Sequence, residues 1–408
     1  MRVIDSISLP NRTFRFKRMH STFFSLIFIG CICLVLDSYG QQQFYTRKSV
    51  PSEYVSVSNE LKKQAFDMTK VLPAGYVQNG GADYTQFLQT AIDKQSIVLM
   101  PAFPVLINEN GLKLRDNSIL IFQRNSRILV KPNKRKDYVI ISIIDVANVK
   151  VYYPNIVGDR NKHLSKIGEW GMGISIRGSK NISIIGGQIN NCWGDGIYVG
   201  NDNGVTSEAV SISYTRISNN RRNGISITSG RNITLDNLYV SNTNGTAPQS
   251  GIDIEPNNPS DIIENIKVNG IVTENNAGDG ISVILSGLVP KNMTRSGIKK
   301  DVQITIADHI DVKSKSGMRI NGRLKNPNSN NMILNGSINV INPKWYGQSD
   351  PMIFGPSKER EKVMEWGFIP KINISNPMIY DKGGKIVDKD NSFVEKVRLK
   401  NKNLKINQ

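Results

Sequence analysis

The chain has 408 residues, with 34 glycines, only three cysteines and a formal net charge of +18 at pH 7. This length is enough for a large core, and length alone would allow two or three domains. So few cysteines exclude a fold that rests on a disulfide framework, and the positive charge favours a polyanionic partner.

The first 40 residues have the pattern of an export signal. A basic stretch is followed by the apolar run Phe23–Leu36 and by small residues before Gln41. The run is shorter than the roughly 20 residues that span a membrane, so we expect cleavage and no transmembrane segment in the mature chain. A lipid anchor at Cys31 is the alternative. The prediction is a signal peptide over residues 1–40 and a secreted or periplasmic protein, or a lipid-anchored surface protein.

Cleavage would leave Cys192 as the only cysteine, so no disulfide could form within the mature chain. Because no histidine is near it in the sequence, we expect this thiol to be a small buried side chain rather than a nucleophile. Stability must then come from a packed core.

A helix is predicted after an N-terminal extension that covers residues 41–80. The polar residues 41–58 are expected to be loose. Within Asp83–Asp93 the apolar residues share one helical face. They are Phe87, Leu88, Ala91 and Ile92. Asp83 can cap the first turn, and we interpret the helix as a cap that protects the open end of a strand stack from edge pairing.

Six strand-like segments follow the helix and predict the first, less regular part of that stack. They are Ser96–Met100, Gly111–Leu114, Ser118–Phe122, Arg127–Val130, Tyr138–Ile144 and Val149–Tyr153.

Short glycine-led strand patterns then recur along the middle of the chain, starting 23 to 37 residues apart. They are Gly173–Ile176, Gly196–Val199, Gly224–Ile227, Gly251–Ile254, Gly280–Val283 and Gly317–Ile320. A second set lies between them: Asn181–Ile184, Val210–Ser213, Asn232–Leu235, Asn265–Val268 and Val302–Thr305. A near-regular period of this size indicates a solenoid in which each repeat buries its apolar face against its neighbours.

The repeats set the expected domain limits. Regular coils run from about residue 171 to 342, followed by a loop-rich insert at Trp345–Gly367 and a last coil near Lys371–Tyr380. The β-helix domain is predicted over residues 81–395, with residues 396–408 as a basic flexible tail. Asparagines gather just before the glycine-led strands, where left-handed turns favour them. They are Asn190, Asn191, Asn219, Asn220, Asn242, Asn275 and Asn276.

The glycine-led strands, the asparagine turns and the helix followed by Ser96–Pro101 together resemble the right-handed parallel β-helix superfamily. This superfamily includes pectate lyases, polygalacturonases and phage tailspike depolymerases, and the resemblance covers roughly residues 80–380. It implies an all-β fold, a right-handed parallel β-helix or pectin-lyase-like solenoid with an N-terminal capping α-helix. It says little about activity, because one fold hosts many chemistries.

Strand alternation predicts which side chains face outward. In Gly251–Glu255 the two isoleucines point into the coil, so Asp253 and Glu255 point to solvent on one face. The same register in the other coils predicts an outward column of Ser175, Tyr198, Ser226, Asp253, Ser282 and Arg319. The residues before each glycine form another column, which contains Asp195 and Asp279. Asp195 and Asp253 are then two coils, about 10 Å, apart.

Such a surface suits the cleavage of a glycosidic bond, which uses one carboxyl group as acid and a second as base or nucleophile. The candidate catalytic residues are Asp195, Asp253 and Glu255. Crowded carboxylates raise one another's pKa, which favours an acid among them. Asp195 and Asp279 both lie in Gly-Asp-Gly, so a role in turn formation stays open for them.

A polar loop over residues 158–171 lies just before these coils and provides further candidates. Trp170 can stack on a sugar, Arg160 and His163 can hold a carboxylate, and an ordinary surface loop is the alternative. The full set of predicted substrate-binding residues is Asp159, Arg160, His163, Glu169, Trp170, Arg177, Tyr198, Asp279 and Arg319.

The resemblance does not extend to one family. Polygalacturonases carry an Asp-Asp pair and a Gly-His-Gly that this chain lacks, so no catalytic assignment is taken from them. Calcium-dependent lyases of this fold cluster outward acids around the metal and use Arg or Lys as base. The resemblance to them implies that calcium could bind carboxylates here, with Arg319 as base. The carboxylates are Asp195, Asp253, Glu255 and Asp279.

The sequence therefore predicts an exported carbohydrate-active enzyme that cleaves an acidic, uronate-type polysaccharide, as a glycoside hydrolase without a cofactor. A calcium-dependent polysaccharide lyase is the first alternative, and a non-catalytic glycan-binding adhesin is the second. Nucleic acid is not expected as a partner, because an exported protein rarely meets it and no binding motif is present.

Overall fold

The computed structural model describes residues 45–288, 299–321, 333–348, 350–354, 370–387 and 404–407. The chain divides into residues 1–43 and 44–408, and all of the described residues belong to the second unit. The predicted signal peptide and lipid anchor lie outside the described residues.

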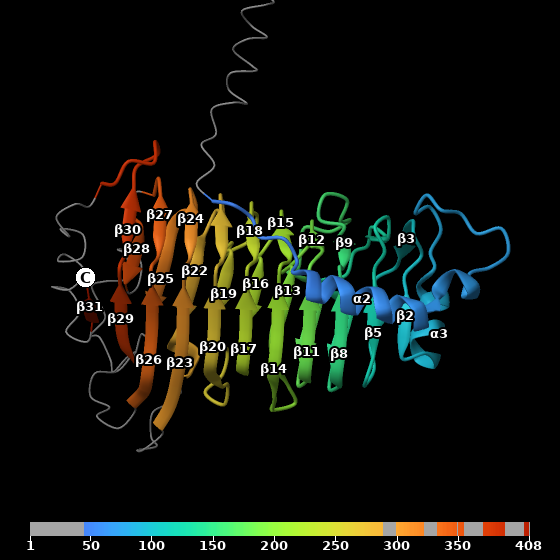
Figure 1. Ribbon diagram of the computed structural model, residues 1–408, viewed down its shortest axis with the longest axis horizontal. Coiled ribbons are helices and arrows are strands. Elements are labelled where there is room, and N and C mark those ends of the chain that lie inside the picture. The colour runs from blue at the N-terminus through green and yellow to red at the C-terminus, as the bar shows by residue number, and fades with distance from the viewer. Residues whose placement is uncertain are drawn as a thin grey trace, which may run out of the picture. The chain divides into compact units, whose positions relative to one another are not determined.

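The second unit is a parallel β-helix, as predicted, in which each full coil contributes one strand to each of three parallel sheets. Figure 1 shows the strands of sheet A side by side along the stack. Sheet A consists of β1 (Phe66–Asp67), β2 (Ile97–Leu99), β5 (Ile119–Ile121), β8 (Ala147–Tyr152), β11 (Lys180–Ile185), β14 (Val205–Ser213), β17 (Gly230–Asp236), β20 (Ile263–Asn269), β23 (Lys299–Ala307), β26 (Ile333–Ile341), β29 (Lys371–Ser375) and β31 (Leu404–Asn407).

The other two sheets complete each coil. Sheet B consists of β3 (Pro104–Ile107), β6 (Arg127–Val130), β9 (Asn155–Val157), β12 (Gln188–Asn190), β15 (Arg216–Ser218), β18 (Tyr239–Ser241), β21 (Val272–Glu274), β24 (Ile310–Val312), β27 (Lys344–Tyr346) and β30 (Met378–Tyr380). Sheet C consists of β4 (Leu112–Lys113), β7 (Asp137–Ile144), β10 (Trp170–Arg177), β13 (Ile197–Asp202), β16 (Ile225–Ile227), β19 (Ile252–Ile254), β22 (Asp279–Ile284), β25 (Ser316–Asn321) and β28 (Met352–Phe354).

The predicted capping helix is present as α3 (Thr85–Lys94). Asp83 accepts the backbone N–H of Thr85 at 3.0 Å, which satisfies a donor of the first turn. Three of the four apolar residues predicted for the buried face are buried, whereas Phe87 is 38% exposed. The described part of the chain also contains two short 3₁₀ helices, η1 (Met68–Val71) and η2 (Leu285–Leu288). None of the described helices is long and apolar enough to span a membrane.

The prediction that residues 41–58 are loose is wrong where helix α2 (Ser52–Gln64) begins. Figure 1 shows α2 lying across sheet A over β5, β8 and β11. Its apolar side, with Tyr54 and Leu61, packs on a cluster of Ile121, Tyr152 and Ile185. These three residues end their strands on the outer face of sheet A, so they need a cover, and α2 supplies it.

The glycine-led strands all lie in sheet C and pair in the predicted register. Their first isoleucines stack inside the coils, and each is fully buried. They are Ile174, Ile197, Ile225, Ile252 and Ile281. Close approach explains the glycine before them: a Cβ on Gly224 would lie 2.2 Å from the Val240 side chain and 2.4 Å from the carbonyl oxygen of Gly251.

The asparagine turns also form as predicted. Asn191, Asn219, Asn242 and Asn275 have φ between 52° and 58°, in the left-handed region that asparagine tolerates. The amide of Asn275 donates to Asn242 Oδ1 of the preceding coil at 2.7 Å, so the side chains bond along the stack.

In the C-terminal part, the structure agrees with the predicted last coil and differs from the predicted insert and tail. Trp345, predicted in a loop-rich insert, belongs to β27 and is 1% exposed in the core. Residues 349 and 355–367 of that insert lie outside the described part. The predicted last coil is present as β29 and β30. Residues Leu404–Asn407 of the predicted flexible tail form β31, which pairs with β29.

Candidate active site

A groove of about 270 Å³ opens on the outer face of sheet C over β19, β22 and β25. It is lined by Ala247, Pro248, Gln249, Asp253, Glu255, Ala277, Gly278, Asp279, Ser282, Ile284, Lys315 and Arg319. Four of the predicted site residues, Asp253, Glu255, Asp279 and Arg319, meet here. They come from three successive coils because Asp253 pairs with Ser282 and Ser282 pairs with Arg319, the column that the sequence predicted.

Asp253 is the buried carboxyl group of the groove, only 2% exposed. Its Oδ2 accepts a hydrogen bond from Asn223 Nδ2 at 3.1 Å, and its Oδ1 has no partner among the described residues. Burial raises the pKa of this carboxyl well above its ordinary value, and the charges of Glu255 and Asp195 raise it further, against the effect of Arg222. Asp253 therefore holds its proton more tightly than an ordinary aspartate does.

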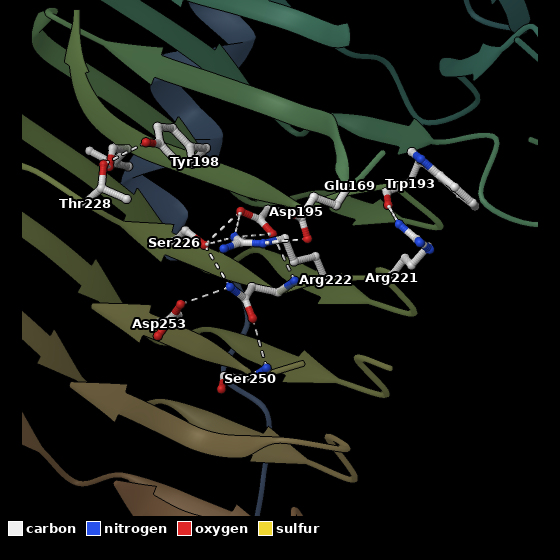
Figure 2. Close-up of polar contacts among 12 residues, drawn as sticks. Glu169, Trp193, Asp195, Tyr198, Arg221, Arg222, Ser226, Thr228, Ser250 and Asp253 are labelled. Carbon is white, nitrogen blue, oxygen red and sulfur yellow. Dashed lines mark hydrogen bonds and ion pairs between the residues drawn. The ribbon is translucent and has the colours of Figure 1, made fainter. Parts of the chain in front are cut away.

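Asp195 is also fully buried, but its surroundings are different (Figure 2). Arg222 Nη1 lies 3.0 Å from Oδ2, Ser226 Oγ donates to Oδ2 at 2.8 Å, and the backbone N–H of Asn223 donates to Oδ1 at 3.0 Å. Burial raises the pKa of Asp195, while Arg222 and these donors oppose the rise. Asp195 does not line the groove, so the structure separates this predicted catalytic residue from the other two.

Asn223 connects the two aspartates and was not predicted as a site residue. Besides its bonds to Asp195 and Asp253, its Nδ2 lies 3.0 Å from Ser226 Oγ, and its Oδ1 accepts the N–H of Ser250 at 3.0 Å. The side chain is fully buried, which fixes its orientation. The sequence placed Asn223 in the column of residues before the glycines, but its side-chain contacts depend on stacking across three coils.

Asp279 and Arg319 form an ion pair at the edge of the groove. Arg319 Nε donates to Asp279 Oδ2 at 2.6 Å, and Ser316 Oγ donates to Oδ1 at 2.5 Å. Glu255 is only partly buried, and Lys315 is exposed. Solvent and ligands therefore reach Glu255 and Lys315 more easily than the carboxylate of Asp279.

The structure places Asp159 and His163 away from any surface ligand, in contrast to their predicted role in substrate binding. Both side chains are fully buried, and His163 Nδ1 lies 2.9 Å from Asp159 Oδ2. Tyr138 and Asn133 donate to the same carboxylate. The His163 ring stacks on Trp193 with centroids 4.0 Å apart. These contacts attach the loop of residues 158–171 to the coils beneath it.

Arg160, another predicted binding residue, attaches the same loop to neighbouring coils. Its Nη1 donates to the carbonyl oxygens of Asn219 and Asn220 at 2.6 and 3.1 Å, and its Nη2 donates to Asn244. Trp193 is 7% exposed and lies under Arg221, 3.8 Å from guanidinium carbon to ring centroid, as Figure 2 shows. Trp193 is therefore a packed side chain and not an open sugar platform.

The remaining predicted residues lie on the outer face of sheet C or its edge, on coils before the groove. Trp170 is 53% exposed at the start of β10. Glu169 lies 3.9 Å from Arg222. Arg177 lies over the Tyr198 ring at 4.4 Å, and the Tyr198 hydroxyl contacts Thr228 Oγ1 at 2.8 Å (Figure 2). None of them lines the groove, so they can contact only a ligand that extends beyond it.

The four carboxylates that the lyase resemblance implies for calcium do not fit such a site. Asp195 is bonded to Arg222 and Asp279 to Arg319, so both have cationic partners already. Within the described ranges no group of three or more His, Cys, Asp or Glu side chains has the geometry to hold a metal ion. Cys192 is buried, as predicted, and burial raises the pKa of its thiol.

Comparison with known sequences finds the β-helix in this chain. The family model described as "Right handed beta helix region" matches residues 172–296. Two uncharacterized proteins of Bacillus subtilis are similar: YclG, 30% identical over 187 residues, and the SPbeta prophage-derived YorA, 29% identical over 162 residues. The matched parts cover 42% and 36% of this chain but only 32% and 28% of those proteins. The chain thus spans about a third of the length of these relatives.

Solved structures show the same architecture. The tailspike protein of Escherichia coli bacteriophage HK620, in complex with a hexasaccharide, aligns with a TM-score of 0.56 and 15% identity over 79% of this chain and 58% of its own. The N-terminal fragment of the bacteriophage phi29 gene product 12 aligns with a TM-score of 0.54 and 15% identity, over 82% of this chain and 65% of its own. At such identities the likeness concerns the fold alone. The chain therefore has the right-handed parallel β-helix fold that its sequence predicted, and these matches assign it to no single family.

Proposed function

We propose that this protein is an exported enzyme that hydrolyses glycosidic bonds in an acidic, uronate-type polysaccharide, with Asp253 and Glu255 as its acid and base. The observation that carries the proposal is the buried Asp253 carboxyl, which lines a surface groove and whose Oδ1 has no partner among the described residues. A buried carboxyl that keeps its proton and lines a groove has the properties of a general acid.

The two carboxyl groups differ in their surroundings, and this difference assigns their roles. The carboxyl of Asp253 is buried and accepts a hydrogen bond from the Asn223 amide at Oδ2, so its charged form is poorly solvated. Glu255 follows on the same face and is partly exposed, so water can reach it. Protonated Asp253 would give its proton to the leaving oxygen, while Glu255 would activate water or attack the sugar carbon directly.

Cations at the groove support an acidic substrate. Lys315 lines the groove, is exposed and has no carboxylate within ion-pair distance in the described part of the chain. A uronate carboxylate could bind Lys315 without disrupting the pair of Arg319 with Asp279. The net charge of +18 adds a long-range attraction for a polyanion.

A solved structure with a similar fold also supports the proposal of a saccharide ligand. The HK620 tailspike was solved with a bound hexasaccharide. Because a shared fold hosts many chemistries, this supports the class of ligand and leaves the reaction to the groove residues.

The test is product analysis on a panel of uronate polymers. Hydrolysis predicts new reducing ends without the ultraviolet absorbance of unsaturated sugars. Asp253→Asn and Glu255→Gln should each lower kcat by about 10²–10⁴-fold, because each removes one proton-transfer group. Unfolding temperatures should stay close to wild type, since both substitutions preserve side-chain shape.

Asp137→Asn is the matched control, because Asp137 is an exposed carboxylate on sheet C that does not line the groove. Its turnover should equal that of the wild type. Unsaturated products would instead indicate a lyase, and the absence of any product across the panel would leave only a binding role. Wild-type rates in both groove variants would remove these carboxylates from the reaction.

A further inference from the structure

A second cavity lies on another side of the solenoid, where the chain turns from sheet A into sheet B. It has a volume of about 450 Å³, within the range of about 300–1,000 Å³ that small-ligand pockets occupy. It is lined by Arg47, Lys62, Phe122, Gln123, Arg124, Tyr153, Asn155, Gly187 and Gln188. We call it the basic pocket. It shares no lining residue with the groove on sheet C.

The charge of the basic pocket is uncompensated. Arg47, Lys62 and Arg124 come from three separate segments: the irregular segment before α2, α2 itself, and the turn after β5. No carboxylate lines the pocket, and none of these three cations has an ion-pair partner in the part of the chain that the structure describes. Lys62 Nζ has only the amide oxygen of Asn59, at 3.3 Å. Three cations from different segments with no counter-charge favour an anionic ligand.

An aromatic ring lies beside these cations. Lys62 Nζ is 5.9 Å from the centroid of the Tyr153 ring, and Ser58 Oγ of α2 donates to the Tyr153 hydroxyl at 3.4 Å. Tyr153 is only partly buried, so part of it is open to the pocket that it lines. An aromatic ring beside cations and side-chain amides suits a sugar ring that carries a negative charge, because ring stacking and ion pairing can act together.

The backbone conformation of Tyr153 recurs in the following coils. Tyr153 has φ of 54°, in the left-handed region that a bulky side chain rarely adopts. The equivalent positions of the next four coils also have positive φ, and they are Gly186, Tyr214, Asn237 and Gly270. Both tyrosines contact α2, because Ser58 donates to the Tyr153 hydroxyl and the Tyr54 ring lies 6.2 Å from the Tyr214 ring. Packing against α2 therefore accounts for the two aromatic residues, and of the two it is Tyr153 that lines the basic pocket.

We propose that the basic pocket is a second, non-catalytic binding site for an anionic sugar residue, held by Arg47, Lys62 and Arg124 beside Tyr153. The proposal is independent of the reaction in the groove, because it needs no proton transfer and shares no residue with it. A site of this kind would hold one part of an acidic glycan while another part reaches the groove on sheet C.

The test measures binding of a uronic acid trisaccharide to the whole protein by calorimetry, with Asp253→Asn in the background so that turnover cannot consume the ligand. The double variant Lys62→Gln and Arg124→Gln should weaken binding at the basic pocket at least about tenfold, because each cation contributes a charge-assisted bond. The affinity should also fall as salt rises.

Lys63→Gln is the matched control, because Lys63 follows Lys62 on α2, pairs with Glu60 and does not line the pocket. It should bind like the parent protein. Circular dichroism checks that α2 stays folded in every variant. Neutral trisaccharide and inorganic sulfate serve as comparison ligands and should both bind more weakly than the uronic acid trisaccharide.

Three results would overturn the proposal. Unchanged affinity in the double variant would show that the cations do not hold the ligand. Equal binding of the neutral trisaccharide would show that charge is not recognised, and equal binding of inorganic sulfate would show a site for bare anions rather than sugars. Loss of groove activity in Asp253→Asn has no bearing on these results, so this proposal and the proposed hydrolysis can fail separately.

Discussion

Two buried aspartates on the same sheet differ because their neighbours differ. Asp195 has a cationic partner in Arg222 and accepts hydrogen bonds from Ser226 and Asn223, which compensates its burial. Asp253 has one oxygen bonded to Asn223 and one without a partner among the described residues, so less compensates the burial of its charge. These different neighbours favour a supporting role for Asp195 and make Asp253 the candidate acid.

The alternation of inward and outward residues along each strand was enough to predict which side chains point out of the coil, because the inward isoleucines determine the register. It was not enough to predict which of those side chains stay accessible. Asp159 and His163 are buried by contacts with Tyr138 and Trp193, which are 21 and 30 residues away from them in the sequence. No local pattern contains that information, so the coordinates were needed to tell which of the predicted residues stay accessible.

A titrating carboxyl inside the coil predicts a pH dependence of stability. Asp311 is fully buried, accepts hydrogen bonds from Thr273 and Gln348, and burial raises its pKa from 3.8 to about 7. The folded protein thus binds this proton more tightly than the unfolded chain does. The stability that it contributes is present below about pH 4 and is lost as pH rises through about 7.

Urea unfolding at pH 5 and pH 8 measures this effect. The free energy of unfolding of the wild type should fall over this interval, with Asp311 contributing up to about 3 kcal/mol of the loss. Asp311→Asn has no proton to lose and should show a smaller fall. Equal slopes for the two proteins would mean that Asp311 does not titrate in this range.

At the scale of elements, the turns after β12, β15, β18, β21 and β24 of sheet B repeat one backbone conformation with different residues. Asn191, Asn219, Asn242 and Asn275 occupy it in successive coils, and Lys313 occupies it in the next, with φ of 61°. Lysine lacks the short amide with which Asn275 donates to Asn242 of the preceding coil. The turn at Lys313 is therefore the weakest of the series.

Lys313→Asn should stabilise the protein by about 1 kcal/mol, because asparagine tolerates the left-handed backbone and can extend the amide ladder from Asn275. Lys267→Asn is the control, since Lys267 is an exposed residue in the middle of β20, where asparagine is a poor strand former. Thermal unfolding should rise in the first variant and not in the second. A lower unfolding temperature for Lys313→Asn would contradict this account of the turn.

The helix α2 shows where periodicity in the sequence was overlooked. Tyr54, Leu61 and Ala65 lie seven and eleven residues apart along one helical face, and all three pack on the outer cluster of sheet A. Most residues between them are polar, so the apolar face of this helix is weak in the sequence. The outward apolar ends of β5, β8 and β11 were the second signal, because such residues on a solenoid surface require a cover.

At the scale of the whole β-helix, repetition confines function to local surfaces. Each coil contacts only its neighbours, so outward residues can change without loss of the core. The groove on sheet C and the basic pocket at the turn into sheet B occupy different surfaces of this one scaffold. A repeated pattern therefore predicts the scaffold well, whereas these surfaces depend on residues that do not repeat.

The central claim is that an acidic sugar chain lies across β19, β22 and β25 with its scissile bond at Asp253. A crystal structure of the Asp253→Asn variant with a bound oligouronate tests it directly. The account predicts a glycosidic oxygen within hydrogen-bond distance of the side chain at position 253 and a sugar carboxylate near Lys315. A saccharide bound elsewhere, with the groove empty at saturating ligand, would contradict it.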